Sequence, residues 1–369
     1  MNKKTVFLFC AAAASSVIMA ISVKKDETII FFPTVSKLNS ETGKWDVLIH
    51  GQVFEKEEDS KTRNYFIEFL RSRMKVEQNT PEADIFKERM RWFLIDNQRW
   101  KTVKVRLQNL SYKLNRSKAN GHFEDQIKLE VKKESDGKFP ETVSYTAELP
   151  DDDSRHFSGK TYLVPDTGIS LVTDIDDTIK ISDVRNKDNL LRNTFQKPFK
   201  EVPGMGDLYS SWAKKNVQIN YVSASPWQMY TMLSEFFQSK GFPDGVYHMK
   251  YVRLTDTDFF NLMMAPDKYK ISTIEPLMKL FPKRKFILVG DSGEKDPEAY
   301  AFLAEKYTEQ VLQILIRDAY PEDGPKRLNE VFSKIPKEKW QSFQNASDIK
   351  KDFLIQNNLE VFFSKVLLL

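Results

Sequence analysis

Residues 171–178 read LVTDIDDT, and this short stretch decides the fold. The apolar, β-branched run is typical of a buried strand, and it ends abruptly in Asp-x-Asp-x-Thr. In open α/β sheets, ligands bind at the carboxyl edge of the strands, which is where Asp174 and Asp176 would lie. Two carboxylates one residue apart repel each other unless a cation or a protein partner compensates them. The stretch therefore predicts a strand that leads two acids into a binding site; the alternative is an acidic turn after a strand.

Three later segments place polar side chains at the end of a strand or a helix in the same way. Residues 219–227 (INYVSASPW) predict a second strand, which ends in hydroxyl groups and is followed by a helix. Residues 286–296 (FILVGDSGEKD) predict a third strand, which ends in a first acid and is followed by another. Between them, residues 267–274 (DKYKISTI) predict the start of a helix with lysines in its first turn. Acids, hydroxyls and a lysine together are the residue types that phosphoryl transfer needs.

The motifs DIDDTIKISDV (174–184), SASPWQMY (223–230) and FPKRKFILVGDSGEKDPEAY (281–300) resemble a known enzyme family in their letters, order and spacing. They look like the haloacid dehalogenase superfamily of aspartyl-phosphate enzymes. More narrowly, they are similar to the phosphatidate phosphatase catalytic domain of the fungal actin-patch-protein type. The resemblance covers about residues 165–318. It implies Mg²⁺-dependent hydrolysis of phosphatidate, or of a related lipid phosphomonoester, at a membrane surface.

The resemblance also implies a catalytic role for five side chains. Asp174 would be the nucleophile, which splits the hydrolysis into two easier steps. Asp176 would protonate the leaving oxygen and then, as a base, activate water. Thr178 would position the loop, Ser223 would bind the phosphoryl oxygens, and Lys270 would neutralise their charge.

The resemblance implies Mg²⁺ as the cofactor. Mg²⁺ is a hard cation that takes oxygen ligands. The implied metal ligands are Asp174, the backbone carbonyl of Asp176, Asp291 and, directly or through water, Asp296. Asp177 and Asp183 are interpreted as loop acids, although Asp183 lies in the matching stretch and could serve the metal site.

For two of these roles the sequence offers an alternative residue. Lys268 competes with Lys270, which is preferred because Ile274 follows four residues later, as in the family's lysine helix. Ser225 competes with Ser223, which is preferred because it lies closer to the end of the strand. Outside such a constellation, a lysine in the first turn of a helix is usually just solvated.

Composition and missing motifs exclude several function classes. The 56 basic residues are mixed among 52 acidic ones, and a net charge of +4 falls short of a nucleic-acid-binding signature. The same charge is compatible with weak attraction to anionic lipid. The sequence has no G-x-x-x-x-G-K-[ST] loop, and its four histidines are not at zinc-like spacing. The single cysteine, Cys10, lies close to the amino terminus, which excludes a disulfide framework from the remainder of the sequence.

Residues 1–24 predict a signal peptide or an N-terminal membrane anchor. Lysine pairs flank an uncharged stretch, residues 5–23, that is longer than a usual signal-peptide core and just reaches spanning length. We therefore expect a protein that is exported, to the periplasm or beyond the cell, or attached to a membrane.

A length of 369 residues predicts two domains after this segment. Alternating apolar and polar residues within 25–150 predict a smaller β-rich, sandwich-like domain. Inside it, residues 64–91 have the basic amphipathic pattern of a helical insertion, which we expect to pack on that sheet. The remaining segments are a linker (151–164), the haloacid dehalogenase-like, Rossmann-like three-layer α/β catalytic domain (165–335) and a C-terminal extension docked on it (336–369).

The spacing of the motifs predicts an open site with little or no cap domain. Fewer than about 50 residues separate Asp174 from Ser223, and Ser223 from Lys270, and helices of the doubly wound sheet occupy much of both intervals. An open site suits a bulky substrate such as a lipid phosphomonoester. The alternatives are a phosphatase for a soluble or protein-borne phosphomonoester, or a non-catalytic lipid-binding module.

Overall fold

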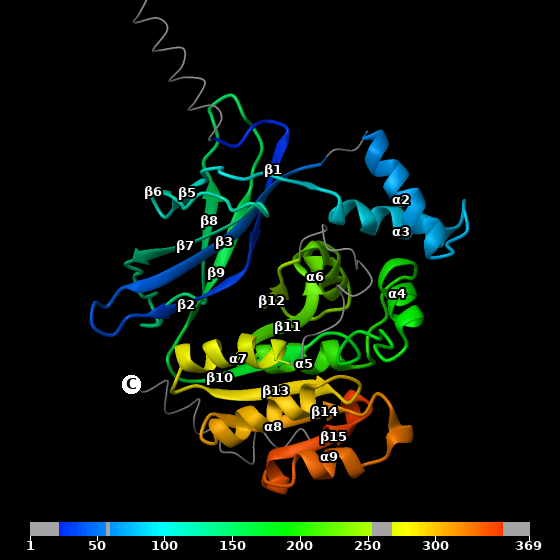
Figure 1. Ribbon diagram of the computed structural model, residues 1–369. Coiled ribbons are helices and arrows are strands. Elements are labelled where there is room, and N and C mark those ends of the chain that lie inside the picture. Colours follow the sequence, from blue (N-terminus) through cyan, green and yellow to red (C-terminus); the bar gives the residue numbers. More distant parts are fainter. Residues whose placement is uncertain (1–21, 57–59, 253–267, 350–369) are drawn as a thin grey trace, which may run out of the picture. The chain divides into compact units, whose positions relative to one another are not determined.

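The computed structural model describes residues 22–56, 60–252 and 268–349 (Figure 1). Residues 1–21, which form most of the expected signal peptide or anchor, lie outside the described residues. Within the described ranges, none of the helices has the length and apolar character needed to cross a bilayer. The chain divides into two compact units, residues 1–64 with 94–164, and residues 65–93 with 165–369, and each is considered by itself.

The first unit is built on a mixed β-sheet, so the predicted β-rich domain is confirmed. Its nine strands are β1 (Glu27–Phe32), β2 (Thr34–Leu38), β3 (Trp45–Glu55), β4 (Asp96–Asn97), β5 (Lys104–Leu107), β6 (Leu110–Lys113), β7 (His122–Leu129), β8 (Thr142–Ala147) and β9 (Ser158–Val164). The main path runs β1-β3-β2-β9-β8-β5-β6, and β4 and β7 also pair with β3. β9 pairs with β2 in parallel and with β8 in antiparallel fashion, so residues expected as a linker belong to the sheet.

The core of the first unit follows from alternation along its strands. In β3, Trp45, Val47 and Ile49 are buried while Leu48 between them is exposed. Successive side chains of a strand point to opposite faces, so the apolar set faces one core. Phe123 of β7 and Tyr145 of β8 pack into the same core.

The second unit contains a six-stranded parallel sheet, which confirms the predicted α/β catalytic domain. Its strands, in spatial order, are β12 (Val246–Lys250), β11 (Gln218–Pro226), β10 (Ile169–Asp174), β13 (Lys285–Asp291), β14 (Val311–Arg317) and β15 (Trp340–Phe343). Every residue of β10 is buried, which requires cover on both faces of the sheet. β15 pairs with β14, so the sheet continues past Pro336, into residues expected as a C-terminal extension. Residues 350–369 of that segment lie outside the described residues.

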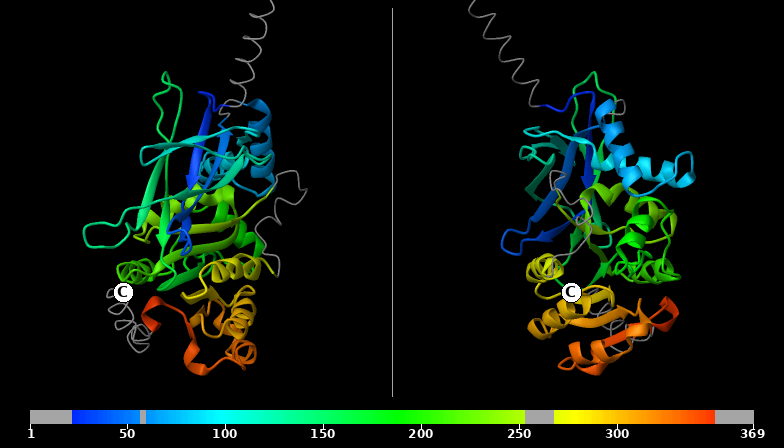
Figure 2. Two further views of the ribbon diagram at one scale, coloured as in Figure 1. Left: turned by 90° about the vertical axis from the view of Figure 1, so that its left-hand side faces the viewer. Right: turned by 45° about the vertical axis from the view of Figure 1, so that its right-hand side comes forward.

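Helices connect these strands in the manner of a doubly wound fold, as Figures 1 and 2 show. They are α4 (Lys187–Phe195), α5 (Met205–Ala213), α6 (Tyr230–Ser239), α7 (Tyr269–Leu280), α8 (Asp296–Lys306) and α9 (Lys326–Val331). Short 3-10 turns lie at Trp227–Met229, Pro321–Asp323, Lys337–Lys339 and Ala346–Asp348. The chain leaves β10 toward β11 and leaves β13 toward β14, in opposite directions along the sheet. The boundary between β10 and β13 is therefore the topological switch point, where such folds bind ligands.

The helical insertion forms α2 (Lys61–Arg73) and α3 (Pro81–Phe93). We expected it to pack on the sheet of the first unit, and that expectation is wrong. The Phe93 ring packs edge-on against that of Phe195 in α4, with centroids 5.5 Å apart, and the Arg89 guanidinium donates to the carbonyl of Thr194 at 2.5 Å. The buried side of α3 thus completes the core of the second unit, which periodicity alone could not reveal.

Candidate active site

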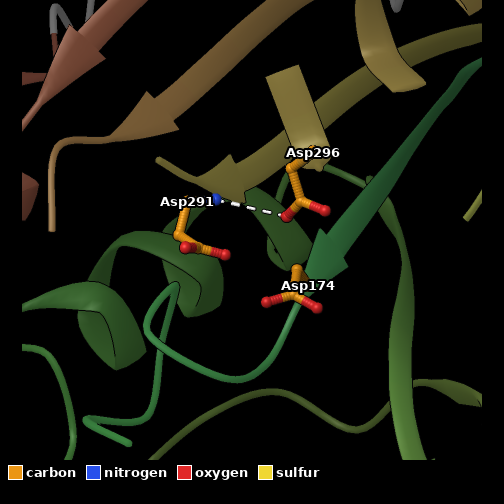
Figure 3. A group of neighbouring side chains, drawn as sticks. All are labelled: Asp174, Asp291 and Asp296. Atoms are coloured by element: carbon orange, nitrogen blue, oxygen red, sulfur yellow. Dashed lines mark hydrogen bonds between the residues drawn. The ribbon is translucent and has the colours of Figure 1, made fainter. Parts of the chain in front are cut away.

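Three buried aspartates meet at the switch point (Figure 3). Asp174 is the last residue of β10, Asp291 is the last residue of the adjacent β13, and Asp296 begins α8. One carboxylate oxygen from each lies within 4.8 Å of the others. Gly290 permits this approach, because a Cβ atom there would lie only 2.3 Å from Asp296 Oδ2. The structure therefore brings together three of the four acids that the sequence predicts around a metal.

Lys270 is the cation that faces this cluster. Its side chain is buried, and its Nζ lies 2.5 Å from Asp174 Oδ1, 2.5 Å from Asp296 Oδ1 and 3.7 Å from Glu294 Oε2. Burial by itself would lower the pKa of Lys270, but the surrounding carboxylates hold that pKa well above its usual value. Lys268 is exposed just before α7, so of the two competing lysines the structure places Lys270 in the site.

The cluster has more negative than positive charge. Burial raises the pKa of Asp174 well above its usual value, although Lys270 opposes this. The pKa of Asp291 is also raised well above its usual value, first by burial and then by the nearby Asp296 carboxylate. Burial also raises the pKa of Glu294, to about 7. Such shifts mean that a second cation would be bound favourably.

Asp291 supplies the most direct indication of where that cation would bind. Its Oδ1 accepts hydrogen bonds from the backbone N–H groups of Gly293 (2.5 Å) and Glu294 (3.2 Å). Its Oδ2 is buried and accepts no hydrogen bond from any residue that the structure describes. A buried carboxylate oxygen without a donor is costly unless a cation compensates it. An all-oxygen donor set of this kind fits a hard divalent ion such as Mg²⁺.

Asp176 lies beside the cluster with its carboxylate fully hydrogen-bonded. Oδ1 contacts Lys180 Nζ (2.7 Å) and accepts from Ser182 Oγ (2.7 Å). Oδ2 accepts from Ser223 Oγ (3.3 Å) and Ser225 Oγ (3.2 Å). Burial would raise the pKa of Asp176, but Lys180 and the hydroxyl groups outweigh it, and the net pKa lies below the usual value. Both competing serines therefore contact the predicted acid–base residue.

Asp177 organises the loop after β10, a role that the sequence did not predict. Asp177 adopts a positive φ of 53°. Its carboxylate accepts hydrogen bonds from the backbone N–H groups of Ser182 (2.8 Å), Asp183 (2.9 Å) and Val184 (2.7 Å). The Asp183 carboxylate accepts from the amide of Asn189 at 2.7 Å and is not among the three clustered acids. The Thr178 hydroxyl donates to Asp174 Oδ2 at 3.1 Å, so it contacts the predicted nucleophile.

Sequence reasoning missed Lys180, Ser182 and Glu294 as residues of the site. Lys180 is almost fully buried, although nothing in the sequence alone distinguishes it from a solvent-exposed lysine. The Asp-x-x-x-Lys spacing from Asp176 would favour a pair only on a helix, and this segment is a loop. A buried position for Lys180 becomes visible only when the loop is folded around Asp177.

Comparisons with known proteins agree with this geometry. Residues 169–318 match the family described as "Phosphatidate phosphatase APP1, catalytic domain". The Saccharomyces cerevisiae protein named Phosphatidate phosphatase APP1 is 33% identical over 216 residues, which are 56% of this chain and 36% of that protein. The Schizosaccharomyces pombe protein named Uncharacterized protein C29B5.04c is 31% identical over 154 residues, 41% of this chain and 25% of that protein. The matches thus span little more than a third of the first relative and a quarter of the second.

Among solved structures, one described as a beta-phosphoglucomutase from Thermotoga maritima aligns with 46% of this chain and with all of its own, at 10% identity and a TM-score of 0.25. The architecture is therefore taken from the strand order and the parallel pairing rather than from this alignment. The family match begins where β10 begins and includes Asp174, Lys270, Asp291 and Asp296. Residues 169–318 of this chain are thus similar to the phosphatidate phosphatase APP1 catalytic domain.

Proposed function

We propose that this chain is a Mg²⁺-dependent phosphatase that hydrolyses phosphatidate, or a related lipid phosphomonoester, through an aspartyl-phosphate intermediate. One observation supports this most strongly: Asp174, Asp291 and Asp296 are buried together at the switch point, with Lys270 against them. They lie in a segment that matches a phosphatidate phosphatase catalytic-domain family. The residues fit Mg²⁺, which Asp174, Asp291 and the carbonyl of Asp176 would hold with Asp296 in support, and which would neutralise phosphoryl oxygens when bound.

In the first step, a carboxylate oxygen of Asp174 attacks phosphorus while the bond to the leaving oxygen breaks. Thr178 and Lys270 each contact one oxygen of this carboxylate, so its orientation is fixed before substrate arrives. Lys270 then faces the charge on the transferring phosphoryl group, and Ser223 donates to one of its oxygens. The proton on Asp176 goes to the leaving alkoxide, which departs as an alcohol.

In the second step, Asp176 removes a proton from water, and the water oxygen attacks phosphorus to release phosphate and regenerate Asp174. The contacts of Asp176 with Lys180, Ser182 and the two serines favour its carboxylate form, which is the form that this step needs. A phosphoryl group that takes the Ser223 hydroxyl would remove one of these donors and so favour the protonated form needed for the first step.

The test measures phosphate release from phosphatidate in mixed micelles and from a soluble aryl phosphate. The protein begins at Ser22, so that the buried core residue Val23 is kept, and each assay is run with Mg²⁺, with EDTA and with the Asp174→Asn variant. Metal-dependent release from phosphatidate that disappears in the variant supports the lipid phosphatase and its nucleophile together. Release from the aryl phosphate alone would favour a soluble or protein-borne substrate. Absence of both activities in a folded protein would favour a non-catalytic lipid-binding module. That residues 1–24 direct export or membrane attachment remains a prediction.

A further inference from the structure

The loop that follows β13, residues 292–294, fixes the orientation of the Asp291 carboxylate. The backbone N–H groups of Gly293 and Glu294 both donate to Asp291 Oδ1, at 2.5 and 3.2 Å. The other oxygen, Oδ2, accepts no hydrogen bond from the described part of the chain, and it is the oxygen that a metal ion would satisfy. Its position therefore depends on the conformation of these three residues.

Two arginines from separate elements hold the carbonyl groups of this loop. Arg185, in the segment between β10 and α4, donates to the Ser292 carbonyl at 2.9 Å and to the Gly293 carbonyl at 3.5 Å. Arg327 of α9 donates to the same Ser292 carbonyl at 2.5 Å and to the Glu294 carbonyl at 2.7 Å. All three carbonyls of the loop therefore accept from a guanidinium group. The planar fork of arginine suits this task, because it directs several donors at once.

Each arginine is itself fixed by an acid outside the loop. Arg185 pairs with Asp323 at 2.5 Å, and Arg327 pairs with Glu298 of α8 at 2.9 Å. The two arginine side chains are still 32% and 30% exposed. Long cationic side chains at a surface normally keep their charged end in water. Here both charged ends are directed instead at the backbone of the same three residues.

Arg185 also holds the ring on which this loop packs. Gly293 has no side chain, and a Cβ atom there would lie 2.5 Å from Cε2 of Tyr320 and 2.8 Å from Asp291 Oδ1. The Arg185 guanidinium lies 4.1 Å over the Tyr320 ring, and the Arg185 backbone N–H donates to the Tyr320 hydroxyl at 3.2 Å. The loop is thus held through its carbonyls and through the ring beside Gly293.

We propose that Arg185 and Arg327 are positioning residues of the Mg²⁺ site, which hold residues 292–294 so that the loop keeps Asp291 oriented for the metal. The inference rests on the proposed function, which supplies the metal, and it deepens that function by naming residues beyond the acids that set metal affinity. A purely electrostatic role predicts the opposite effect. Like charges repel, so removal of a cation near the site would tighten Mg²⁺ binding, whereas loss of positioning weakens it.

The test measures binding of Mg²⁺ alone to the metal-free protein by isothermal titration calorimetry, so it needs no catalysis. The protein begins at Ser22, and the variants are Arg185→Gln, Arg327→Gln and Arg327→Lys. The matched control is Arg155→Gln in the first unit. The Arg155 side chain is 29% exposed, donates to a backbone carbonyl at 2.8 Å and pairs with an acid at 2.6 Å. Urea-induced unfolding in EDTA measures the stability of every variant separately.

We expect the Kd for Mg²⁺ to rise about tenfold in each glutamine variant, because outer partners of metal ligands typically contribute that much to affinity. Arg327→Lys should weaken binding nearly as much, since a single ammonium group does not reproduce the fork that joins two carbonyls. Arg155→Gln should lower the free energy of unfolding and leave the Kd unchanged. Arg185 and Arg327 lie in different elements, so failure of one variant to fold leaves the other as the test.

Unchanged or tighter Mg²⁺ binding in the folded glutamine variants would overturn the positioning role. An equal loss of affinity in Arg155→Gln would also overturn it, because the effect would then follow from general destabilisation. Wild-type protein that binds no Mg²⁺ would overturn both this inference and the proposed function. Arginine-dependent Mg²⁺ binding in a protein without phosphatase activity would refute only the proposed function.

Discussion

Replacing Asp291 by Asn should stabilise the metal-free protein while it abolishes activity. Asp291 Oδ2 is buried without a donor in the described part of the chain, and two further carboxylates lie within 4.8 Å. Two like charges at that distance repel by about 3 kcal/mol at an effective dielectric constant of about 20. Lys270 offsets part of this repulsion, so we expect a net gain of about 1–3 kcal/mol in the free energy of unfolding. Asn keeps the Oδ1 acceptor for the two backbone N–H groups and adds a donor directed at the acids.

The assay is urea-induced unfolding in EDTA and in Mg²⁺, followed by circular dichroism. In EDTA the Asp291→Asn protein should unfold at a higher urea concentration than the wild type, with an unchanged slope. In Mg²⁺ the wild type should gain stability by linkage to metal binding, and the variant should gain little.

Asp177→Asn is the matched control, because it makes the same change at another buried acid near the site. The Asp177 carboxylate accepts hydrogen bonds from three backbone N–H groups and from the Tyr320 hydroxyl, so Asn there should destabilise by about 1–3 kcal/mol. If Asp291→Asn destabilised the metal-free protein as Asp177→Asn does, the electrostatic account of the cluster would be refuted.

Three further substitutions test the proposed roles in turnover. Lys270→Met should lower kcat about 10²–10³-fold through lost stabilisation of the phosphoryl charge, whereas Lys268→Met should stay within about twofold; equal losses would remove Lys270 from its role. Asp176→Asn should slow hydrolysis of an alkyl phosphate about 10²–10⁴-fold and that of an aryl phosphate less, because a good leaving group needs no acid; equal losses on both substrates would count against the acid role. Gly290→Ala should abolish activity and lower the free energy of unfolding by about 1–3 kcal/mol, since its Cβ would lie 2.3 Å from Asp296 Oδ2. Steady-state kinetics and thermal melts check this. A variant with wild-type activity and stability would show that the close approach is not needed.

Short stretches of sequence were enough to predict two of the buried strands and the acids at their ends. The LVTD and FILVGD runs gave two strands and their terminal acids, and parallel pairing then brought those acids together. The choice of Lys270 over Lys268 rested instead on the resemblance, because Ile274 follows four residues later as in the family's lysine helix. The strands and their acids could be predicted because strand period, turn residues and the shared edge of a parallel sheet are set by short stretches.

Long-range packing accounts for what could not be predicted. Residues 64–91 show an apolar helical face, but nothing in that face specifies Phe195 rather than the β-sheet as its partner. β9 enters the sheet by parallel pairing with β2, which lies far away in the sequence, and β15 has only four residues and is placed by its pairing with β14. Lys180 is buried because Phe199 and Asp176 enclose its side chain, and both contacts depend on tertiary structure.

The site also shows how the fold tolerates an arrangement that is unfavourable by itself. Asp174 and Asp291 are held together although burial, and then repulsion by neighbouring carboxylates such as Asp296, raises the pKa of both. The strands that end in these acids are apolar and buried along their length, so hydrophobic burial outweighs the local repulsion. The same repulsion would favour a bound divalent cation, because the cation would relieve it. Stability lost in the metal-free protein would then be returned on metal binding, and this is why the sign of the Asp291→Asn effect in EDTA is the decisive measurement.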